Sequence, residues 1–575
     1  MILPLATIIK KKIRKQVYYY AVESKRVDGK PRIVWQQYLG KFDDIVRRAQ
    51  QDRQKPVEAK IFEFGAVAAL YHLATKIGLV ELIDQVVPKR NQGASVGQYM
   101  LLAAINRAVH PVSKSEFADW YTSTSLPRWI DVSPKALTSQ RFWDHMARLD
   151  QAAIEQIEER LTRQLVLRFD LDLRCLIYDA TNFFTWIDTA ADAQLPQRGH
   201  NKAKRNDLKQ VGLAMMVTTD FHIPLFHRIY AGNTTDSKQF GSVLTDLSDR
   251  YKAIAESCEN VTLVFDKGNN AKHNFSALAD SPFHFVGSLS PSQHADLLAI
   301  AADQFRPLTN PRLGGVTAHR TCKTLFGVER TVVITYNESL YLGQKQGLLL
   351  QRRKANDALR ELQRRVLTAF EPGKRGKKPT VESVRKQVQA ILKERKLKGD
   401  WLQASVEQTE HGIAFTYSWD HEAIARYEES TLGKTLLFTD QSSWTEEEIV
   451  LAYRGQSKIE EAFKKMKNPH FLSWTPRYHW TDPMIRVHAF YCILALTLTS
   501  LLQRELYRKG IPLSTTEMLA QLSEIREVAH IYPEGSGIKP QITLTRCSEL
   551  QEKLVKELEI SSYRSDFVGN TSSNP

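Results

Sequence analysis

The run Arg174-Cys-Leu-Ile-Tyr-Asp179 has a close counterpart in Val261-Thr-Leu-Val-Phe-Asp266, and these two stretches decide the predicted fold. Each is a short apolar β-strand pattern that ends at an aspartate and leads into a loop. Two further strand patterns, residues 211–217 and 223–230, lie between them, and their separation suits an antiparallel hairpin. Residues 236–259 have helical periodicity. Strands joined through a crossover helix predict an α/β sheet.

The segments on either side of this sheet differ in their periodicity. Residues 16–42 alternate apolar and polar side chains around Asp28-Gly29-Lys30, which predicts a β-hairpin. Residues 62–168 repeat apolar side chains at helical spacing. The chain therefore divides into six predicted regions: a basic segment with the hairpin (1–55), a helical domain (56–170), the first part of the sheet core (171–289), an insertion with short strands and a basic helical hairpin (290–430), the second part of the core (431–505), and a C-terminal helical segment with a disordered tail (506–575).

The charge of the chain points to a polyanionic partner. The 575 residues contain 79 Lys or Arg and 64 Asp or Glu, a formal net charge of +15. Residues 352–398 alone contain 16 Lys or Arg against 5 Asp or Glu, a net charge of +11. A solvated helical hairpin would explain such a run. An arm that contacts phosphates, with the tip at residues 374–378 most exposed, would explain its concentration.

Composition also argues against several protein classes. The apolar run at residues 489–502 is shorter than the roughly 18–20 residues of a membrane span, so we expect a buried core helix. At the N-terminus the apolar stretch precedes the charged run 10–15, the wrong order for a secretory signal. Five cysteines lie far apart, without a Cys-x-x-Cys pair. We therefore expect no membrane partner, no disulfide framework and a cytoplasmic location.

The two strand-end aspartates are candidate metal ligands. A carboxylate at the end of a buried strand is costly unless a cation compensates its charge. A divalent metal held by Asp179 and Asp266 would do so, and Mg²⁺ prefers carboxylate oxygens. The alternative is that each aspartate caps the turn that follows its strand.

A third carboxylate comes from the predicted helix at residues 444–468. Ile459, Phe463 and Met466 form its apolar stripe. An adjoining face carries Tyr453, Gln456, Glu460, Lys464 and Lys467 at three-, four- and seven-residue steps. Glu460 borders the buried stripe, whereas Glu461 points about 100° away. Taken alone, this helix also fits a solvated amphipathic surface.

These residues match a known pattern. The sequence resembles the bacterial insertion-sequence DDE transposases with a ribonuclease H-like core, whose signature is Tyr, two residues, Arg, three residues, Glu, six residues, Lys. Tyr453, Glu460 and Lys467 occupy three of these positions, and Gln456 stands at the Arg position next to Arg454. Further matches follow in the family's order: Asp179-Ala-Thr-Asn182, residues 199–210, 224–236, Asp266-Lys-Gly268, His479 and 485–488, preceded by 23–30 and 39–41.

The resemblance implies a fold, a reaction and a cofactor. It implies a ribonuclease H-like mixed α/β core interrupted by an insertion domain before the catalytic Glu, which explains the 194 residues between Asp266 and Glu460. Asp179, Asp266 and Glu460 would be the catalytic residues and would hold two Mg²⁺ ions about 3.5–4 Å apart, for which Mn²⁺ could substitute. One ion would activate the attacking oxygen and the other would stabilise the leaving oxygen during cut-and-paste transposition.

The resemblance also implies the DNA contacts. Tyr453, Arg454 and Lys467 would bind the DNA near the scissile phosphate. Sequence-independent affinity would come from two basic groups: Lys202, Lys204 and Arg205, and Lys374, Arg375, Lys377 and Lys378. The helical domain 56–170, with Trp120, Arg141 and Trp143, would read the ends of the element. The expected partner is double-stranded DNA, as transposon ends and target, bound by a homodimer at the bacterial nucleoid.

Two alternatives stay open. One is a DNA-binding protein of transposase descent that no longer cleaves, against which the three retained carboxylates argue. The other is a ribonuclease H-like metal-dependent nuclease, such as a junction resolvase. The long insertion and the pair Tyr453 and Lys467 argue against it, because a simple nuclease does not need to hold paired ends.

Overall fold

The structure is a computed structural model, and the chain forms two compact units. One unit comprises Met1–Arg148 with Leu498–Pro575, and the other comprises Leu149–Thr497. The residues whose structure is described are 7–13, 16–27, 30–51, 55–88, 93–187, 193–201, 205–254, 260–373, 375–468, 471–472, 474, 479, 481–534 and 538–564. Each unit is described below by itself.

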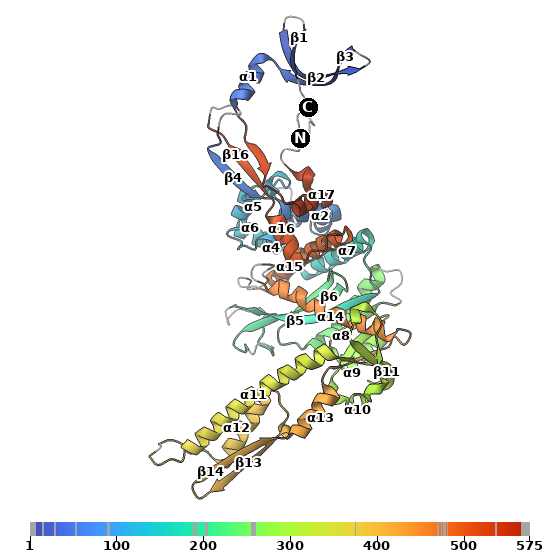
Figure 1. The fold of residues 1–575 in the computed structure, drawn as a ribbon, viewed down its shortest axis with the longest axis vertical. Helices are drawn as coiled ribbons and strands as arrows, with labels where there is room; N and C mark the ends of the chain where they lie inside the picture. Colours follow the sequence, from blue (N-terminus) through green and yellow to red (C-terminus); the bar gives the residue numbers. More distant parts are fainter. Residues whose placement is uncertain are drawn as a thin grey trace. The chain divides into compact units, whose positions relative to one another are not determined.

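A nine-stranded mixed sheet is the centre of the second unit (Figure 1). Its strand order is β10-β11-β12-β15-β9-β8-β5-β6-β7. The meander β5–β6–β7 is antiparallel, and β8 and β9 run parallel to β5. The bounds are β5 (Cys175–Thr185), β6 (Lys209–Thr218), β7 (Pro224–Ala231), β8 (Thr262–Val264) and β9 (His284–Leu289), with α8 (Asp236–Ile254) between β7 and β8. The predicted α/β sheet, its hairpin and its crossover helix are therefore confirmed.

The sheet continues into the segment expected to be an insertion. Strand β15 (Lys434–Thr439) pairs antiparallel with β9 on one side and with β12 (Val328–Asn337) on the other. β11 (Val316–Leu325) and β10 (Arg306–Pro307) complete the sheet. One of the short strands expected in the insertion, β12, thus belongs to the main sheet, because its backbone hydrogen-bonds to β15, which follows the predicted insertion in the sequence.

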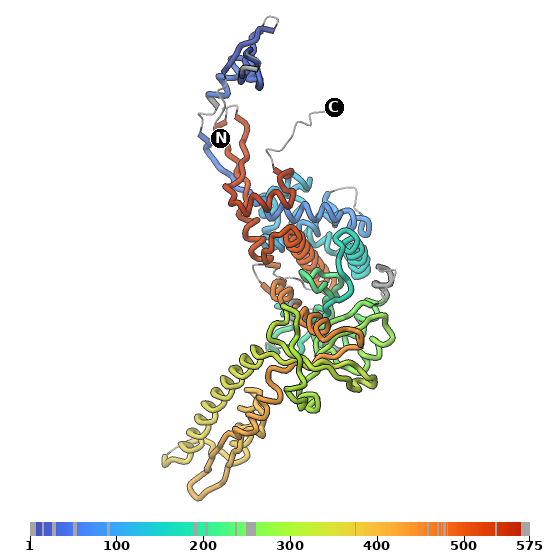
Figure 2. The backbone as a smooth tube through the Cα atoms, turned by 45° about the vertical axis from the view of Figure 1, so that its right-hand side comes forward, coloured from blue at the N-terminus to red at the C-terminus, as the bar shows by residue number. Residues whose placement is uncertain are grey.

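The helical hairpin within residues 290–430 has a core of its own. α11 (Glu338–Thr368) and α12 (Val381–Glu394) lie side by side, together with the hairpin of β13 (Leu402–Thr409) and β14 (Gly412–Trp419) and with α13 (His421–Thr431) (Figures 1 and 2). Leu359 and Leu362 of α11 and Val384 and Val388 of α12 are buried in this core. These are the apolar positions that the helical periodicity predicts. We call residues 338–433 the arm.

The two faces of the sheet pack against different helices. On one face, the ring of Tyr178 lies 4.9 Å from that of Phe240 in α8, and Phe240 lies 4.8 Å from Phe265. On the other face, α14 (Glu446–Lys467) crosses β5 closely. A Cβ atom on Gly455 of α14 would lie only 3.1 Å from Cδ1 of Ile177. Glycine therefore sets how closely this helix approaches the strand.

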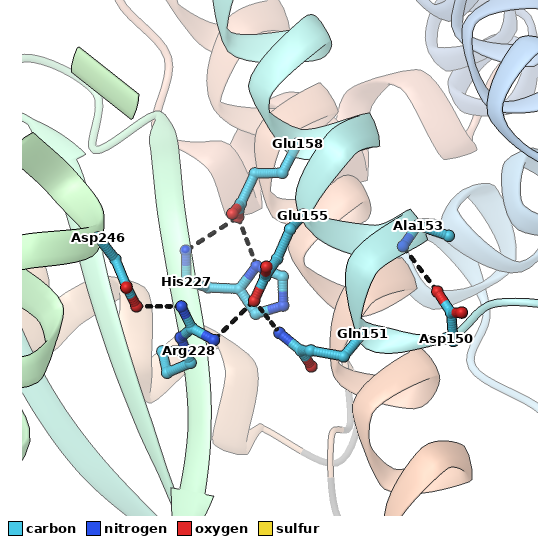
Figure 3. A network of polar contacts seen from close by, with 8 residues as sticks. All are labelled: Asp150, Gln151, Ala153, Glu155, Glu158, His227, Arg228 and Asp246. Carbon is cyan, nitrogen blue, oxygen red and sulfur yellow. Dashed lines mark hydrogen bonds and ion pairs between the residues drawn. The ribbon is translucent and has the colours of Figure 1, made fainter. Parts of the chain in front are cut away.

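A buried polar network fixes α7 (Gln151–Phe169) to the edge strand β7 (Figure 3). Glu158 accepts hydrogen bonds from the backbone amide of His227 at 2.9 Å and from its ring Nδ1 at 2.5 Å. The neighbouring Arg228 pairs with Glu155 of α7 and with Asp246 of α8. Glu158 and His227 are 7% and 6% exposed. One strand is thereby tied to two helices.

The first unit contains a small β-sheet and a group of helices. β1 (Thr7–Ile13), β2 (Gln16–Val27) and β3 (Lys30–Gly40) form an antiparallel sheet that is followed by α1 (Phe42–Gln51). The predicted hairpin is confirmed as β2–β3, and β1 is an additional strand; its turn, Asp28-Gly29, lies outside the described residues. The helices expected within residues 62–168 are α2 (Gly65–Ile77), α3 (Leu79–Val86), α4 (Val96–Val109), α5 (Phe117–Thr122), α6 (Ser139–Met146) and, in the second unit, α7.

The C-terminal segment is only partly helical. It contains α16 (Thr515–Ser523) and α17 (Glu549–Glu557), but also β16 (Arg526–Ile531) and β17 (Gln541–Leu544). β16 pairs antiparallel with β4 (Glu58–Glu63), which begins the region expected to be all helical. The expectation of helices alone was wrong here, because each of these short strands finds its partner in a distant part of the sequence. The expected disordered tail falls on residues 565–575, outside the described residues.

One described helix, α15 (Asp482–Arg508), is long and apolar enough to cross a membrane. Its most apolar window is 94% buried inside the protein. The prediction of a buried core helix at residues 489–502 is therefore confirmed.

Breaking the buried pair of α7 and β7 tests how much this network stabilises the second unit. Glu158→Ala removes the acceptor of two buried hydrogen bonds from His227 and should lower the free energy of unfolding by about 1–3 kcal/mol. The matched control is Glu159→Ala, which removes the next carboxylate along the helix, 36% exposed and 3.8 Å from Arg163. It should change the free energy of unfolding by less than about 1 kcal/mol. Thermal unfolding of both variants measures the difference, and equal melting temperatures would contradict the assignment.

Candidate active site

The two aspartates lie side by side where a parallel ladder ends. The last pair of the β5–β8 ladder is Ile177↔Val264, and Asp179 and Asp266 each follow it by two residues. They therefore project from the same face of neighbouring strands, which are about 4.8 Å apart. Each carboxylate accepts one backbone amide: Ala180 N–H donates to Asp179 Oδ1 at 2.8 Å and Lys267 N–H to Asp266 Oδ1 at 2.7 Å.

The two aspartates differ in one respect from the expectation. Asp266 follows β8, as predicted, and caps the short 3₁₀ helix Lys267–Asn269. Asp179 does not end its strand: β5 continues to Thr185, because it remains paired with β6 (Asp179↔Met215) after β8 has stopped. The sequence shows where an apolar run ends, but a strand whose next residues are half-buried can continue as long as one neighbour pairs with it.

α14 brings the third carboxylate to the same face. Its start is fixed by a capping box, in which the side chains of Thr445 and Glu448 bond each other's backbone amides. Gly455 lies against Ile177, and Lys467 Nζ donates to Thr181 Oγ1 at 2.7 Å. The helix therefore runs in the same direction as β5, and Glu460, between these two contacts, lies along the part of the strand that holds Asp179.

All three carboxylates line one cavity of about 500 Å³. The lining residues are Asp179, Asp266, Val316, Thr335, Asn337, Leu340, Thr435, Leu437, Val450, Tyr453, Arg454, Gln456 and Glu460. Asp179 and Asp266 are half-buried, and Glu460 is exposed. The cavity lies between the face of β5 that carries Asp179, helix α14 and residues of β12 and β15.

The donor set of this cavity suits a hard divalent cation. Among the described residues that line it there is no His or Cys, and the candidate ligands are carboxylate oxygens. In the described part of the chain, however, no three His, Cys, Asp or Glu side chains form a group able to hold one ion. The carboxylates share the cavity without meeting at one point. Because Glu460 is exposed, rotation of its side chain alone changes its distance from the two aspartates.

Tyr453 is a neutral donor at the edge of the acidic group. Burial is the main cause that raises its pKa to about 12, and the charges of Asp266 and Asp179 raise it further. A hydrogen bond with Ser288 partly offsets these effects. Ser288 Oγ also lies 3.5 Å from Asp266 Oδ1. Sequence reasoning missed Ser288, because a serine at the end of an apolar strand has no distinguishing pattern.

The other predicted DNA contacts near the cavity have partners within the protein. Arg454 lines the cavity and donates from Nη1 to the backbone oxygen of Arg312 at 2.8 Å. Lys467 lies over the ring of Phe183 at 5.1 Å, in addition to its bond with Thr181. Gln456, at the Arg position of the signature, also lines the cavity.

The more distant basic candidates divide into three groups. Lys202, Lys204 and Lys374 lie outside the described residues. Arg205 is held by Asp207 at 2.7 Å, and Lys378 donates to the backbone oxygen of Ala369 and lies 5.3 Å from the ring of Phe370. Arg375 and Lys377 are exposed at the tip of the arm. These last two are best placed to meet an external phosphate.

Two other sequence interpretations concern buried residues. Trp120 was a candidate for reading DNA, and this is wrong: it is 4% exposed and donates from Nε1 to Glu63 at 3.3 Å. His479 and His488 belong to the motifs that resemble the family. They are 2% and 3% exposed and hydrogen-bond each other at 2.7 Å, which supports a structural role.

Comparison with known proteins places this site in a family. Residues 171–498 match the model of the transposase DDE domain. The chain belongs to the DDE transposase family. Among solved structures it is similar to the piggyBac transposase in a synaptic complex with hairpin DNA, with 9% identity, a TM-score of 0.36 and coverage of 81% of this chain and 82% of that one. A TM-score this low does not establish a common fold, so membership rests on the domain model. No curated protein sequence matches the chain significantly.

The raised pKa of Tyr453 gives this transposase a testable alkaline titration. Tyr453→Phe should remove one phenol that ionises at about pH 12 in the folded protein, compared with about 10 when unfolded. Because the folded pKa is the higher one, the stability that this phenol contributes is complete below about pH 10 and is lost as the pH rises toward 12. The measurement is the difference in phenolate absorbance between the parent protein and the variant. A difference that is already complete near pH 10 would contradict the assignment.

Proposed function

We propose that the chain cleaves the ends of a DNA element and joins them to a target by in-line phosphoryl transfer. The observation that carries this proposal is the single cavity lined by Asp179, Asp266 and Glu460, which come from β5, from the loop after β8 and from α14. Three carboxylates drawn from distant parts of the sequence have no evident packing role there. Together with family membership, they support a site that handles phosphate through divalent cations.

The proposed core is ribonuclease H-like. The sheet half β7-β6-β5-β8-β9 combines an antiparallel meander with two parallel strands, and the proposed active site lies where the two parts meet. The arm interrupts this core between β12 and β15, before the helix that carries Glu460. This arrangement accounts for the long interval between the second and third carboxylates.

The proposed cofactor is Mg²⁺, with Mn²⁺ as a substitute, held by Asp179, Asp266 and Glu460. When bound, such ions activate an attacking oxygen and stabilise a leaving one. The protein's own residues would do the rest. Tyr453, neutral at physiological pH, would donate its hydroxyl proton to a phosphate oxygen beside the cavity. Lys467 and Arg454 would supply positive charge near the scissile phosphate.

The proposed biological setting follows from this chemistry. Cut-and-paste transposition requires two ends to be held together, so we propose a homodimer in the complex with double-stranded DNA. We further propose that it acts at the nucleoid of a bacterial cytoplasm. Joining of cut ends in the presence of Mg²⁺ would support transposition. Retention of DNA without cutting would indicate a binding protein, and cutting without joining would indicate a simple nuclease.

Conservative substitution of each carboxylate tests the proposed chemistry. Asp179→Asn, Asp266→Asn and Glu460→Gln should each lower the rate of Mg²⁺-dependent cleavage by more than about 100-fold, because even residues outside the metal shell cost 10–100-fold when they are lost. DNA binding should change little. Glu461→Gln is the matched control: it removes the neighbouring exposed carboxylate, which does not line the cavity. Cleavage at the parental rate by any of the three variants would exclude that residue from the site.

Neutralising the tip of the arm tests its proposed contact with phosphate. Arg375→Gln combined with Lys377→Gln should weaken binding equally for all DNA sequences and reduce the salt slope of the binding constant by about 2. The comparison variant, Arg364→Gln with Lys386→Gln, removes two arm cations that already pair with Glu361 and Glu382 at 2.9 and 2.7 Å. This comparison variant should reduce the salt slope of DNA binding by less than the tip variant does. Equal salt slopes for the parent protein and the tip variant would show that this loop is a solvated surface and does not contact phosphate.

A further inference from the structure

The N-terminal sheet is a second concentration of positive charge. Residues 7–51 contain 12 Lys or Arg against 4 Asp or Glu, a net charge of +8. Together with the +11 of residues 352–398, this exceeds the +15 of the whole chain. The role of this segment is not explained by the cavity or by the arm.

Strand register divides the sheet into two distinct faces. Paired residues of antiparallel strands project from the same face. One face carries Tyr18, Tyr20 and Tyr38, whose rings lie 6.0 and 5.2 Å apart in the pairs Tyr18–Tyr38 and Tyr20–Tyr38. Val22, on this tyrosine face, is only 3% exposed, and Asp44 and Arg48 of α1 act electrostatically on Tyr38. α1 therefore adjoins the tyrosine face near Tyr38, and its first residue, Phe42, also lies 6.1 Å from the ring of Tyr19 at the end of the other face.

The opposite face is exposed and cationic along both edges. On edge strand β1 it carries Lys10 and Lys12, which pair with Tyr19 and Val17 of β2. On the other edge strand, β3, it carries Lys30 and Arg32, which pair with Val27 and Lys25. All four edge cations are exposed. Lys25, in the middle strand, is 3.1 Å from Glu23 and is thus partly neutralised.

Between the edge cations the same face carries one ion pair, Glu23 with Lys25, and otherwise uncharged side chains that can contact chemical groups of a ligand. The middle strand presents Val17, Tyr19 and Ala21. On β3, Trp35 pairs with Glu23 and is 44% exposed, and Gln37 pairs with Ala21 and is also exposed. A Gln side chain can bond adenine with both its donor and its acceptor, and apolar side chains contact the thymine methyl group.

These dimensions match the major groove of DNA. Three strands about 4.8 Å apart place the two edge strands about 10 Å from each other. The groove is about 12 Å wide and is bordered on both sides by phosphates. A sheet with cations on both edges and no net charge on its middle strand is complementary to that arrangement. Known sheet-type readers use strands in this way.

We propose that the cationic face of the β1–β2–β3 sheet binds double-stranded DNA in the major groove, with Lys10, Lys12, Lys30 and Arg32 on the phosphates and with Trp35 and Gln37 on base edges. This would place sequence recognition in the sheet, in addition to the helical domain. The proposal rests on the proposed function in one respect only: DNA is the substrate of the chain.

Binding of the full chain to labelled DNA, without divalent metal so that no cleavage occurs, tests the proposal. One duplex has the sequence found at the end of the DNA element, next to the gene for this chain. The other duplex has the same length and a scrambled sequence. Lys12→Gln with Arg32→Gln should weaken binding to both by at least about ten-fold and reduce the salt slope by about 2. Lys553→Gln with Lys556→Gln, two exposed cations of α17, is the control of equal charge and should leave the slope unchanged.

A second pair of variants separates recognition from charge. Trp35→Ala and Gln37→Ala should leave the salt slope unchanged but reduce the preference for the end duplex over the scrambled one by about five-fold or more. All the altered side chains are exposed, so thermal unfolding should match that of the parent protein.

Unchanged affinity and salt slope in Lys12→Gln with Arg32→Gln would overturn the proposal. Binding of the protein to anionic lipid vesicles would then identify a membrane surface as the ligand of this face. Loss of a dimer in sedimentation when Trp35 is replaced would instead identify a second copy of the chain. The outcome is independent of catalysis: if Asp179→Asn cleaves normally, the proposed chemistry fails while these binding differences still stand.

Discussion

The adjacent positions of Asp179 and Asp266 are the constraint on which the candidate site of the second unit depends. Two half-buried carboxylates that project from neighbouring strands, which are about 4.8 Å apart, are unfavourable unless a cation lies between or beside them. β8 ends at Val264, two residues before Asp266, whereas β5 continues past Asp179 to Thr185. The close approach of α14 at Gly455 then brings Glu460 to the same cavity.

The distribution of charge follows from this constraint. A cavity lined by three carboxylates repels a polyanion, so affinity for DNA has to come from elsewhere in the chain. Two separate segments, residues 7–51 and 352–398, carry more than the entire net positive charge. Near the cavity, Tyr453 remains neutral because its burial and the adjacent aspartates raise its pKa. It can therefore donate a hydrogen bond to phosphate without adding to the negative charge.

The sequence predicted those parts of the fold whose signal is local. The apolar runs before Asp179 and Asp266, the helical hairpin of the arm and the buried helix at 489–502 are all predicted by local patterns in the sequence. The strand ends and strand pairings that could not be predicted from the sequence depend on partners far along the chain. β5 continues past Asp179 because β6 still pairs with it after β8 has ended. β16 pairs with β4, and β12 joins the main sheet through a strand that lies beyond the arm. Ser288 could not be predicted for the same reason, because only the fold brings it next to Tyr453.

The proposed binding of a cation by the three carboxylates is tested most directly by locating a bound ion. Fe²⁺ can replace Mg²⁺ at oxygen ligands, and with peroxide and ascorbate it cuts the protein backbone close to where it binds. The account predicts three groups of cuts, near residues 179, 266 and 460, all suppressed by excess Mg²⁺ and all lost together in Asp179→Asn. Cuts near only one of these residues, or cuts elsewhere that Mg²⁺ suppresses equally well, would contradict it.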